Sequence, residues 1–283
     1  MQNKIRKLEK KANWVRKQVL EMIVSAGRGH IGGALSCTDI LVALYYGGIL
    51  RFDCDDENWD QRDRFILSKG HSGAALYAIL SDIGYFSLSQ LRSYQKEGCI
   101  LGGHPSRKIP GIEADTGSLG HGLGIGAGLA LSAKMDRKDF MTVVLLGDGE
   151  CCEGSVWEAA MFAAHHKLDN LVGIVDKNGL CVTDRIEDCV AMNPLDEKWK
   201  AYGWDVIVVD GHCFEALLSA FGNFRCRETG KPLMVIANTV KGKGVSFMEG
   251  NLSWHHSVPK GEQLKIARQE LKWPLRVLDK RQI

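Results

Sequence analysis

Two polar residues follow two apolar segments of the sequence, at a spacing that leaves room for one helix between them. Asp148 comes directly after the apolar, β-branched-rich run 143–146, and Asn178 lies in "DKNGL" thirty residues later. The carboxyl ends of successive parallel strands meet at one edge of a sheet, so both side chains and the carbonyl of Leu180 should lie together. One carboxylate, one amide oxygen and one carbonyl suit a hard cation such as Mg²⁺. "GDG" alone is more typical of a turn, and it is the pairing with "DKNGL" that favours a site.

Four histidines stand in segments whose glycines or polar residues favour loops. They are His30 in "RGHIGG", His71 in "KGHSG", His104 in "GGHP" and His255 in "SWHHS". Histidine moves protons near neutral pH, so a site that assembled these residues could add and remove protons at hydroxyl groups. Any one of them alone is more typical of a solvated polar side chain, and His256 is an alternative to its neighbour.

The elements that must position these residues begin with helices. Apolar residues at alternating steps of four and three predict an amphipathic helix from Ile5 to Ala26, which stops at "AGRGHIGG". A second helix is expected to be capped by Ser36 or Thr38 and to run through "DILVALYYGGIL". Glycines that recur among alanines in "GLGIGAGLALSA" predict a buried helix with close packing.

Apolar runs then alternate with helical patterns. The candidate strands are "RFILS", "TVVLL", "NLVGIVD", "DVIVVD" and "LMVIANT", and helices between them are expected in "SVWEAAMFAAHHK", "PLDEKWKAYG" and "CFEALLSAFGNFR". This alternation predicts right-handed crossover units and a doubly wound α/β fold, with a mostly parallel sheet and helices on both faces. No repeat or linker divides the chain, so residues 1–283 are expected to form a single domain with an irregular tail from about Lys241.

The composition excludes several classes of protein. Of the 283 residues, 45% are hydrophobic and 25% are charged, which is typical of a globular protein and not of a disordered one. A formal net charge of +2 indicates neither a nucleic acid nor a membrane partner. The nine cysteines include no CxxC pair and follow no signal peptide, which indicates reduced thiols and a cytoplasmic location.

The sequence around these candidate residues resembles the thiamine-diphosphate motif of the transketolase family. "GDGE" and "DKNGL" carry the resemblance together with further segments in the family's order: "GRGHIGG", "DRFILSKGH", "GGHP", "TGSLGHGLGIGAGLAL", "YGWDVIVVDGH", "KGKGVSFMEG" and "WHH". These segments cover nearly all of residues 10–260, and the similarity is to the N-terminal, diphosphate-binding part. The resemblance implies a thiamine-diphosphate enzyme that transfers a two-carbon ketol unit from a ketose to an aldose.

The resemblance also implies roles for individual residues. Asp148, Asn178 and the carbonyl of Leu180 would hold Mg²⁺, or Ca²⁺ or Mn²⁺ in its place, against the cofactor's diphosphate. The catalytic positions would be His30, His71, His104 and His255. The cofactor-binding positions would also include Lys69, His71, Thr116, Gly117, Ser118, Leu119, Gly147, Gly149, Glu153, Lys243 and His255.

Two positions have a second interpretation. In the family an acidic residue at the position of Glu153 lies near the dimer interface, where it can share protons with the partner's active site. A glutamate at a helix N-terminus also stabilises the helix without any such role. His121 stands where the family often has Gln, and it is a further candidate for the site.

Departures from the family leave the substrate open. Ile31 stands where many transketolases carry Pro, and "CVTDR" replaces the polar segment that often follows the metal loop. Ordinary sugar phosphates and modified sugars are both compatible with these changes. A non-catalytic thiamine-diphosphate-binding regulatory subunit is an alternative, which the intact Asp148, Asn178 and loop histidines oppose. A dinucleotide-dependent oxidoreductase would need a GxGxxG that opens a helix after the first strand, and the sequence has none.

The resemblance leads to an expectation about partners. In full-length transketolases a pyrimidine-binding domain follows the region matched here, whereas this sequence ends at Ile283. We therefore expect a split enzyme that is active only with a C-terminal transketolase subunit. We expect a heterotetramer of two copies of each chain, in which this chain also associates with a second copy of itself. The last helical pattern places Leu264, Ala267 and Leu271 on one face, which we expect to dock on a partner.

Overall fold

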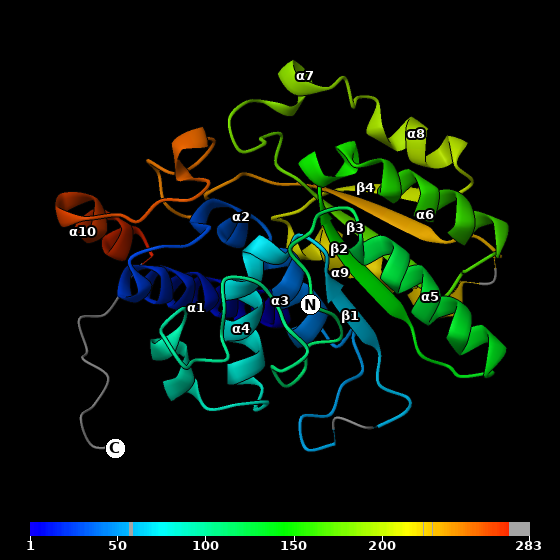
Figure 1. Ribbon diagram of the computed structural model, residues 1–283, viewed down its shortest axis with the longest axis horizontal. Coiled ribbons are helices and arrows are strands. Elements are labelled where there is room, and N and C mark those ends of the chain that lie inside the picture. Colours follow the sequence, from blue (N-terminus) through cyan, green and yellow to red (C-terminus); the bar gives the residue numbers. More distant parts are fainter. Residues whose placement is uncertain (57–58, 223, 228, 272–283) are drawn as a thin grey trace.

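A five-stranded parallel sheet forms the centre of the molecule, with the strand order β1-β2-β3-β5-β4 (Figure 1). The computed structural model describes residues 1–56, 59–222, 224–227 and 229–271. All neighbouring strands run parallel, so the α/β fold predicted from the sequence is confirmed. The strands are β1 (Arg64–Leu67), β2 (Thr142–Gly147), β3 (Leu171–Lys177), β4 (Asp205–Asp210) and β5 (Leu233–Asn238).

The central strands are buried because their side chains alternate between two hydrophobic layers. In β2, Val143 and Leu145 belong to one layer, and Val144 and Leu146 belong to the other. Every residue of β2 is buried. A strand that is covered on both faces needs an unbroken apolar run, and this is why the run before Asp148 shows no alternation of polar and apolar residues.

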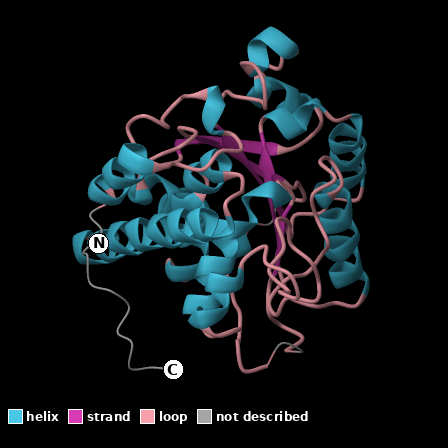
Figure 2. Ribbon diagram, turned by 60° about the vertical axis from the view of Figure 1, so that its left-hand side comes forward, coloured by secondary structure: helices cyan, strands magenta, loops and turns pink. Residues whose placement is uncertain are grey.

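Helices cover both faces of the sheet, as Figure 2 shows from the side. One layer contains α1 (Gln2–Ala26), α2 (Ile31–Ser36), α3 (Thr38–Tyr46), α4 (Gly73–Asp82) and α9 (Phe214–Gly222). The opposite layer contains α5 (Gly122–Met135), α6 (Gly154–His165) and α8 (Leu195–Ala201). The remaining elements are α7 (Ile186–Cys189), α10 (Gly261–Glu270) and the 3₁₀ helices η1 (Gly70–Ser72), η2 (Leu88–Ser93), η3 (Gly149–Cys152), η4 (Phe224–Cys226) and η5 (Leu252–Trp254).

The segment after the first helix contains an element that the sequence did not predict. α1 ends at Ala26, and Gly27 follows it in the left-handed conformation with φ 69°, as the glycine at this position indicated. Residues 31–36 then form the short helix α2 instead of a loop. All six are buried, so tertiary packing stabilises a helix whose two glycines disfavour it.

The helix expected from "DILVALYYGGIL" has different ends. Its N-cap is Cys37, so the prediction of Ser36 or Thr38 as the cap is wrong. The Thr38 hydroxyl instead donates a hydrogen bond of 2.8 Å to the carbonyl of Ala34 in α2. α3 ends before two glycines, because the second of them, Gly48, has φ 72°, a conformation that stops a helix.

α5 is buried only on the side that faces the sheet, so the prediction of a buried helix is confirmed for that side alone. Leu123, Ala127 and Ala130 pack into the layer next to the sheet. Gly126 lies so close to Val144 that a Cβ there would collide with it. The other side of α5 and the neighbouring part of α6 expose four apolar side chains, here called the outer apolar surface: Ile125 (41% exposed), Met135 (75%), Met161 (53%) and Phe162 (41%).

The last described helix, α10, packs on this chain and not on a partner. Ala267 and Leu271 are buried in the layer that contains α1. Arg268 forms an ion pair of 2.7 Å with Glu21 of α1, and Asn13 of α1 donates a hydrogen bond of 3.1 Å to the carbonyl of Leu271. The prediction that this face docks on a partner is therefore wrong, because α1 already covers it.

Three further points concern the extent of the chain. The segment 241–260 is mostly irregular apart from η5, and α10 follows it within the stretch that was expected to form an irregular tail. Residues 272–283, which include the end of the predicted terminal helix, lie outside the described residues, as does Asn223 of the helix predicted at 213–225. The single domain over 1–283 therefore stays a prediction.

Among the described residues, every helix is too short or too polar to span a bilayer.

A charged side chain on the buried face of α10 tests how this helix packs on α1. Ala267 is 0% exposed, so we expect Ala267→Glu to lower the free energy of unfolding by roughly 3 kcal/mol, because the carboxylate would be buried without a partner. Gln269→Glu adds the same group at an exposed position of the same helix and should leave stability nearly unchanged. Urea unfolding of the two variants measures the difference, and equal stability would show that α10 does not rest on α1.

Candidate active site

Residues after four neighbouring strands surround one hollow of about 200 Å³, here called the edge hollow. Lys69 follows β1, Asp148 follows β2, Asn178 follows β3 and Lys241 follows β5. This arrangement results from the parallel order, since the carboxyl ends of adjacent parallel strands share one edge. The rest of the wall is formed by Gly33, His71, Leu119, Gly147, Gly149, Glu150, Leu180, Cys181, Val182 and His255.

Asp148 is tied to the turn that follows β3. One carboxylate oxygen accepts a 2.9 Å hydrogen bond from the amide of Gly149, and the other accepts one of 2.5 Å from the amide of Gly179. The side-chain oxygen of Asn178 accepts from the amide of Leu180 at 3.2 Å. The structure therefore brings together the three oxygen donors that the sequence spacing predicted.

The donor set fits a hard cation next to a phosphate group. Burial raises the pKa of Asp148 to about 6, and the nearby Asp176 carboxylate adds to this although backbone amides oppose it. A buried carboxylate in this state gains stability from a bound cation. Carboxylate, amide and carbonyl oxygens are ligands that Mg²⁺ accepts, with phosphate oxygens completing its coordination. Residues Asp148, Asn178 and Leu180 would hold the cation.

A buried ion pair lies beneath the hollow, and the sequence did not predict it. Lys69 pairs with Asp176 of β3, and their side chains are 2% and 0% exposed. Asp176 also accepts hydrogen bonds from Ser36 at 2.5 Å and from Thr239. Burial disfavours the charged form of Lys69, but the Asp176 carboxylate outweighs burial and raises the pKa of the ammonium. Lys69 therefore brings a positive charge to the wall of the hollow.

Lys241 lines the edge hollow, whereas Lys243, which was predicted to bind the cofactor, does not. The Lys241 ammonium donates to the carbonyls of Cys181 at 2.5 Å and Leu180 at 3.3 Å, beside the proposed cation site. Burial, together with a neighbouring ammonium, lowers the pKa of Lys241 to about 8. Lys243 instead faces the carboxylate of Glu249 at 3.5 Å and is not part of the wall.

Glu150 is a second buried residue that the sequence analysis missed. Its carboxylate accepts hydrogen bonds from the amide of Gly120 at 2.9 Å and the amide of Gly147 at 3.0 Å, and also from the Ser68 hydroxyl. These donors belong to three separate segments of the chain. Glu150 thereby fixes the predicted cofactor segment 116–119 relative to the turn around Asp148.

The segment 116–119 contributes to the site unevenly. Leu119 lines the edge hollow, and Thr116 has a buried hydroxyl without a hydrogen-bond partner among the described residues. Gly117 has φ 138°, and a Cβ on it would lie 2.8 Å from the ring of His104. Ser118 is exposed and lies 3.4 Å from a ring nitrogen of His121. A glycine is therefore required where the segment passes the histidines.

The four predicted histidines lie close together and His256 joins them, and two of them, His71 and His255, line the hollow. The ring centre of His30 lies 5.4 Å from His71, 5.8 Å from His104, 5.3 Å from His255 and 4.6 Å from His256. These five residues are here called the histidine cluster. Four loops that are far apart in the sequence supply them, so the fold alone creates the cluster.

The pKa values of four histidines of the cluster, His30, His71, His104 and His255, are lowered, which favours their neutral forms near neutral pH. Burial is the largest cause, and it lowers the pKa of His30 and His255 from 6.5 to about 4, with neighbouring histidines and Lys241 acting in the same direction. Burial also lowers the pKa of His71 and His104. Nδ1 of His255 is buried and has no hydrogen-bond partner among the described residues. Neutral rings of this kind can accept and donate hydrogen bonds to hydroxyl groups that enter the hollow.

Two other candidates lie beside the site and not in its wall. Glu153 is exposed at the N-cap of α6 and makes no capping hydrogen bond, so both of its interpretations stay predictions. His121 occupies the N-cap of α5, where its Nδ1 lies 3.1 Å from the carbonyl of Leu119. It is held near the segment that lines the hollow without joining the histidine cluster.

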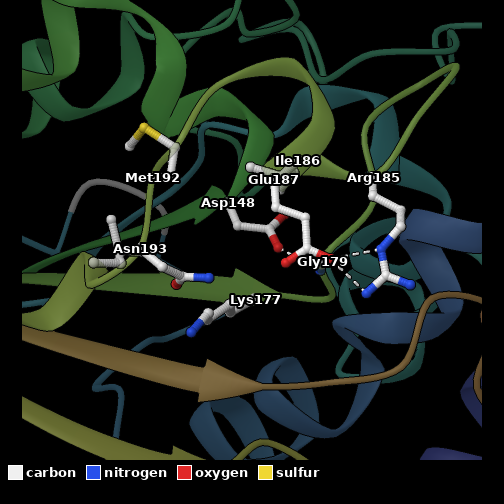
Figure 3. A pocket seen from close by; sticks show the side chains of 9 residues that line it. Asp148, Lys177, Gly179, Arg185, Ile186, Glu187, Met192 and Asn193 are labelled. Carbon is white, nitrogen blue, oxygen red and sulfur yellow. Dashed lines mark hydrogen bonds and ion pairs between the residues drawn. The ribbon is translucent and has the colours of Figure 1, made fainter.

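A second, smaller hollow, of about 80 Å³, is also lined by Asp148. Figure 3 shows the segment from Gly179 to Asn193 folded around it, with the Asp148 carboxylate directed at Gly179. Arg185 pairs there with Glu187 at 2.7 Å. This segment therefore separates the two hollows and forms a wall of each.

Comparison with known proteins identifies the family. Residues 8–277 match the family described as "Transketolase, thiamine diphosphate binding domain". The chain belongs to the transketolase family. It is 43% identical over 273 residues to an apulose-4-phosphate transketolase subunit of Phocaeicola vulgatus, and the alignment covers 96% of each chain. It is 41% identical over 265 residues to the 6-deoxy-6-sulfo-D-fructose transketolase subunit SqwG of a Clostridium species, covering 93% of this chain and 96% of that one.

The fold agrees with that assignment. The crystal structure of the transketolase from Campylobacter jejuni superposes with a TM-score of 0.91 at 31% identity, covering 96% of this chain and 44% of that chain. The predicted family, its α/β fold and a transketolase-type transferase are confirmed, and the chain carries the thiamine diphosphate binding domain.

The buried histidines predict a dependence of stability on pH. Because the pKa values of His30 and His255 fall from 6.5 to about 4 on folding, the unfolded chain binds protons more readily between these values. Stability from these groups is complete above the unfolded pKa and is lost as the pH falls through this window. His30→Asn should therefore show a smaller loss of stability between about pH 7 and about pH 5 in urea unfolding than the unmodified chain.

His165→Asn is the control for this prediction, since His165 is exposed at the end of α6. It should retain the full loss of stability on acidification. An identical pH dependence in His30→Asn and the unmodified chain would show that the histidine cluster does not stay neutral through burial.

Proposed function

We propose that this chain is the diphosphate-binding subunit of a split transketolase, which moves a two-carbon ketol unit from a ketose to an aldose only together with a pyrimidine-binding subunit. The observation that carries the proposal is the edge hollow itself. Asp148, Asn178 and Leu180, which offer oxygen atoms to a cation, line it together with His71 and His255 of the histidine cluster. Relatives of nearly the same length that are named transketolase subunits support the division into two chains.

The residues that line the hollow would hold the cofactor in one orientation. Asp148, Asn178 and the carbonyl of Leu180 would bind Mg²⁺, and the Lys69 and Lys241 ammonium groups would offset the remaining negative charge of the diphosphate. The backbone at Gly149 can approach the diphosphate closely because no side chain stands there. When bound, thiamine diphosphate supplies a carbanion that adds to the ketose carbonyl and stores the transferred electron pair.

The histidine cluster would serve the sugar. His30, His71, His104 and His255 are neutral near pH 7 for the reasons given above, so each ring can accept a proton from a sugar hydroxyl at one nitrogen. Their common position beside the hollow would also exclude water from the bound sugar. His256 is added to the four predicted residues because its ring lies 4.6 Å from that of His30.

The relatives suggest the kind of sugar. One is named for apulose 4-phosphate and another for 6-deoxy-6-sulfo-D-fructose. We propose that the donor or acceptor of this enzyme is likewise a modified sugar and that the pyrimidine-binding subunit provides much of its recognition. Screening ketose donors for ketol transfer by mass spectrometry, with both subunits present, tests this choice.

The outer apolar surface supports self-association within a larger assembly. Met135 and Met161 are 75% and 53% exposed, and Ile125 and Phe162 are each 41% exposed. Apolar side chains grouped on neighbouring helices gain stability when a second copy or a different chain covers them. We propose a heterotetramer of two copies of each subunit. A cytoplasmic location is also proposed, on the basis of nine cysteines that are all free thiols.

Removing one ligand of the cation should weaken cofactor binding strongly. Asp148→Asn and Asn178→Ala should each weaken Mg²⁺-dependent binding of thiamine diphosphate about 100-fold or more, because the cation tolerates few substitutions among its oxygen ligands. Calorimetry measures this affinity directly. Asp188→Asn is a control that removes the same charge from the exposed surface of α7. Unchanged affinity in both site variants would remove the basis for the cation site.

Reconstitution tests the division into two subunits. The purified chain alone should show no ketol transfer, and adding the pyrimidine-binding subunit should restore turnover and tighten cofactor binding. The reason is linkage, because a cofactor that binds the assembled form better also stabilises the assembly. Robust turnover by the isolated chain, with mass spectrometry showing no copurifying subunit, contradicts the proposal.

A further inference from the structure

A histidine outside the histidine cluster joins two distant parts of the fold. His212 lies in "DGH" directly after β4, and the proposed reaction does not use it. Its Nδ1 lies 2.7 Å from a carboxylate oxygen of Asp39 in α3, and its Nε2 lies 2.9 Å from the backbone nitrogen of Val240. The amide of His212 donates a hydrogen bond of 2.8 Å to Asp210, which fixes the residue at the end of β4. The ring therefore links α3 to the segment that follows β5.

The two ring contacts determine which nitrogen of His212 carries a proton. A backbone N–H can only donate, so Nε2 must accept the hydrogen bond from Val240 and has no proton of its own. Nδ1 then carries the proton of the neutral ring and donates it to the Asp39 carboxylate. A ring that is protonated on both nitrogens would lose the bond to Val240. Only the neutral ring with a proton on Nδ1 makes both bonds.

Asp39 is itself fixed by α1, so it can orient the ring. Its two carboxylate oxygens accept hydrogen bonds of 3.0 and 2.6 Å from the Arg16 guanidinium, and the two side chains are 6% and 9% exposed. Burial opposes the charged form of Asp39, but Arg16 and the bond to His212 outweigh it and lower the pKa of the carboxyl group. The Arg16 side chain also passes the turn after β5, since a Cβ on Gly244 would lie 3.1 Å from its Cδ.

The far end of this link adjoins the wall of the edge hollow. Val240 directly precedes Lys241, whose ammonium lines the hollow and donates to two carbonyls beside the proposed cation site. The backbone of Lys241 is held on both sides. The amide before it is bound by the His212 ring, and the amide after it, that of Gly242, donates to the carbonyl of Gly32 at 3.0 Å. The place of the ammonium therefore depends in part on the ring.

We propose that His212 is a positioning residue, which links the Asp39 carboxylate to the backbone before Lys241 and thereby holds the ammonium at the wall of the edge hollow. The link itself rests on contacts within this chain. Its effect on thiamine diphosphate rests on the proposed function, in which Lys241 offsets charge of the diphosphate. In this role His212 acts through Lys241 and not on the cofactor or the sugar itself.

NMR of the full chain tests the tautomer without any cofactor. Long-range nitrogen–proton spectra of the chain with isotope-labelled histidine distinguish a protonated ring nitrogen from an unprotonated one. The signals of His212 are assigned by their absence in His212→Asn. We expect Nδ1 to be protonated and Nε2 to be unprotonated near neutral pH. A proton on Nε2 would overturn the proposal, because the ring could not then accept a hydrogen bond from Val240.

Two substitutions that differ by one methylene group test the link. His212→Asn leaves a side-chain amide near the position of Nδ1 and offers no acceptor to Val240, whereas His212→Gln is long enough to place its oxygen near the position of Nε2. Hydrogen exchange of the Val240 amide should be about tenfold or more faster in His212→Asn than in the unmodified chain. His212→Gln should keep this rate within about threefold of the unmodified chain. Equal exchange in His212→Asn and the unmodified chain contradicts the link.

A double-mutant cycle tests whether His212 acts through Lys241. Calorimetry measures the Mg²⁺-dependent binding of thiamine diphosphate to the unmodified chain, His212→Asn, Lys241→Met and the double variant. We expect each single substitution to weaken binding about tenfold. The double variant should bind no more than about twofold more weakly than Lys241→Met. If the two effects multiply instead, His212 does not act through Lys241 and the positioning role is wrong.

These measurements separate the positioning role from the proposed function. If the unmodified chain does not bind thiamine diphosphate, the proposed function fails. The tautomer and the exchange rate of the Val240 amide then still decide whether His212 holds the backbone before Lys241, because neither measurement needs cofactor or sugar.

Discussion

The buried ion pair between Lys69 and Asp176 is the interaction on which the rest of the site depends. Both charges are almost completely removed from water, and such charges are stable only with a close partner and further hydrogen bonds. Ser36 and Thr239 supply these bonds to Asp176. The pair and its hydrogen bonds thus link three segments to the central strand β3: α2, Lys69 after β1 and Thr239 after β5. The edge hollow lies next to these contacts.

Buried groups of both charges line the hollow. Asp148 and Glu150 are buried carboxylates whose pKa values burial raises, while Lys241 is a buried ammonium whose pKa is lowered. Each group is therefore poorly solvated before anything binds. A cation and an anion that enter together replace the lost solvation of both kinds of charge, and so the pocket favours a metal complex of a phosphate over either ion alone.

The sequence was sufficient for the parts of the site that follow directly from strand ends. Asp148 and Asn178 could be placed together because apolar runs mark where strands stop and parallel strands share an edge. Glu150 could not be recognised, since nothing near it in the sequence shows that Ser68 and Gly120 approach it in the fold. The choice between the lysines of "KGKG" depended on the turn at Gly242, whose φ is 81°, and composition does not encode which of them faces inward.

The close packing of the histidine cluster has a consequence for how much charge it can store. Four rings lie with centres 4.6–5.8 Å from that of His30, in a region that is partly shielded from water. Once one ring has gained a proton, its charge opposes a second protonation on every neighbour, because Coulomb repulsion at this separation is strong outside bulk water. Among His30, His71, His104 and His255, a proton taken up from one hydroxyl group would therefore raise the cost of taking up a second, so these rings favour moving one proton at a time.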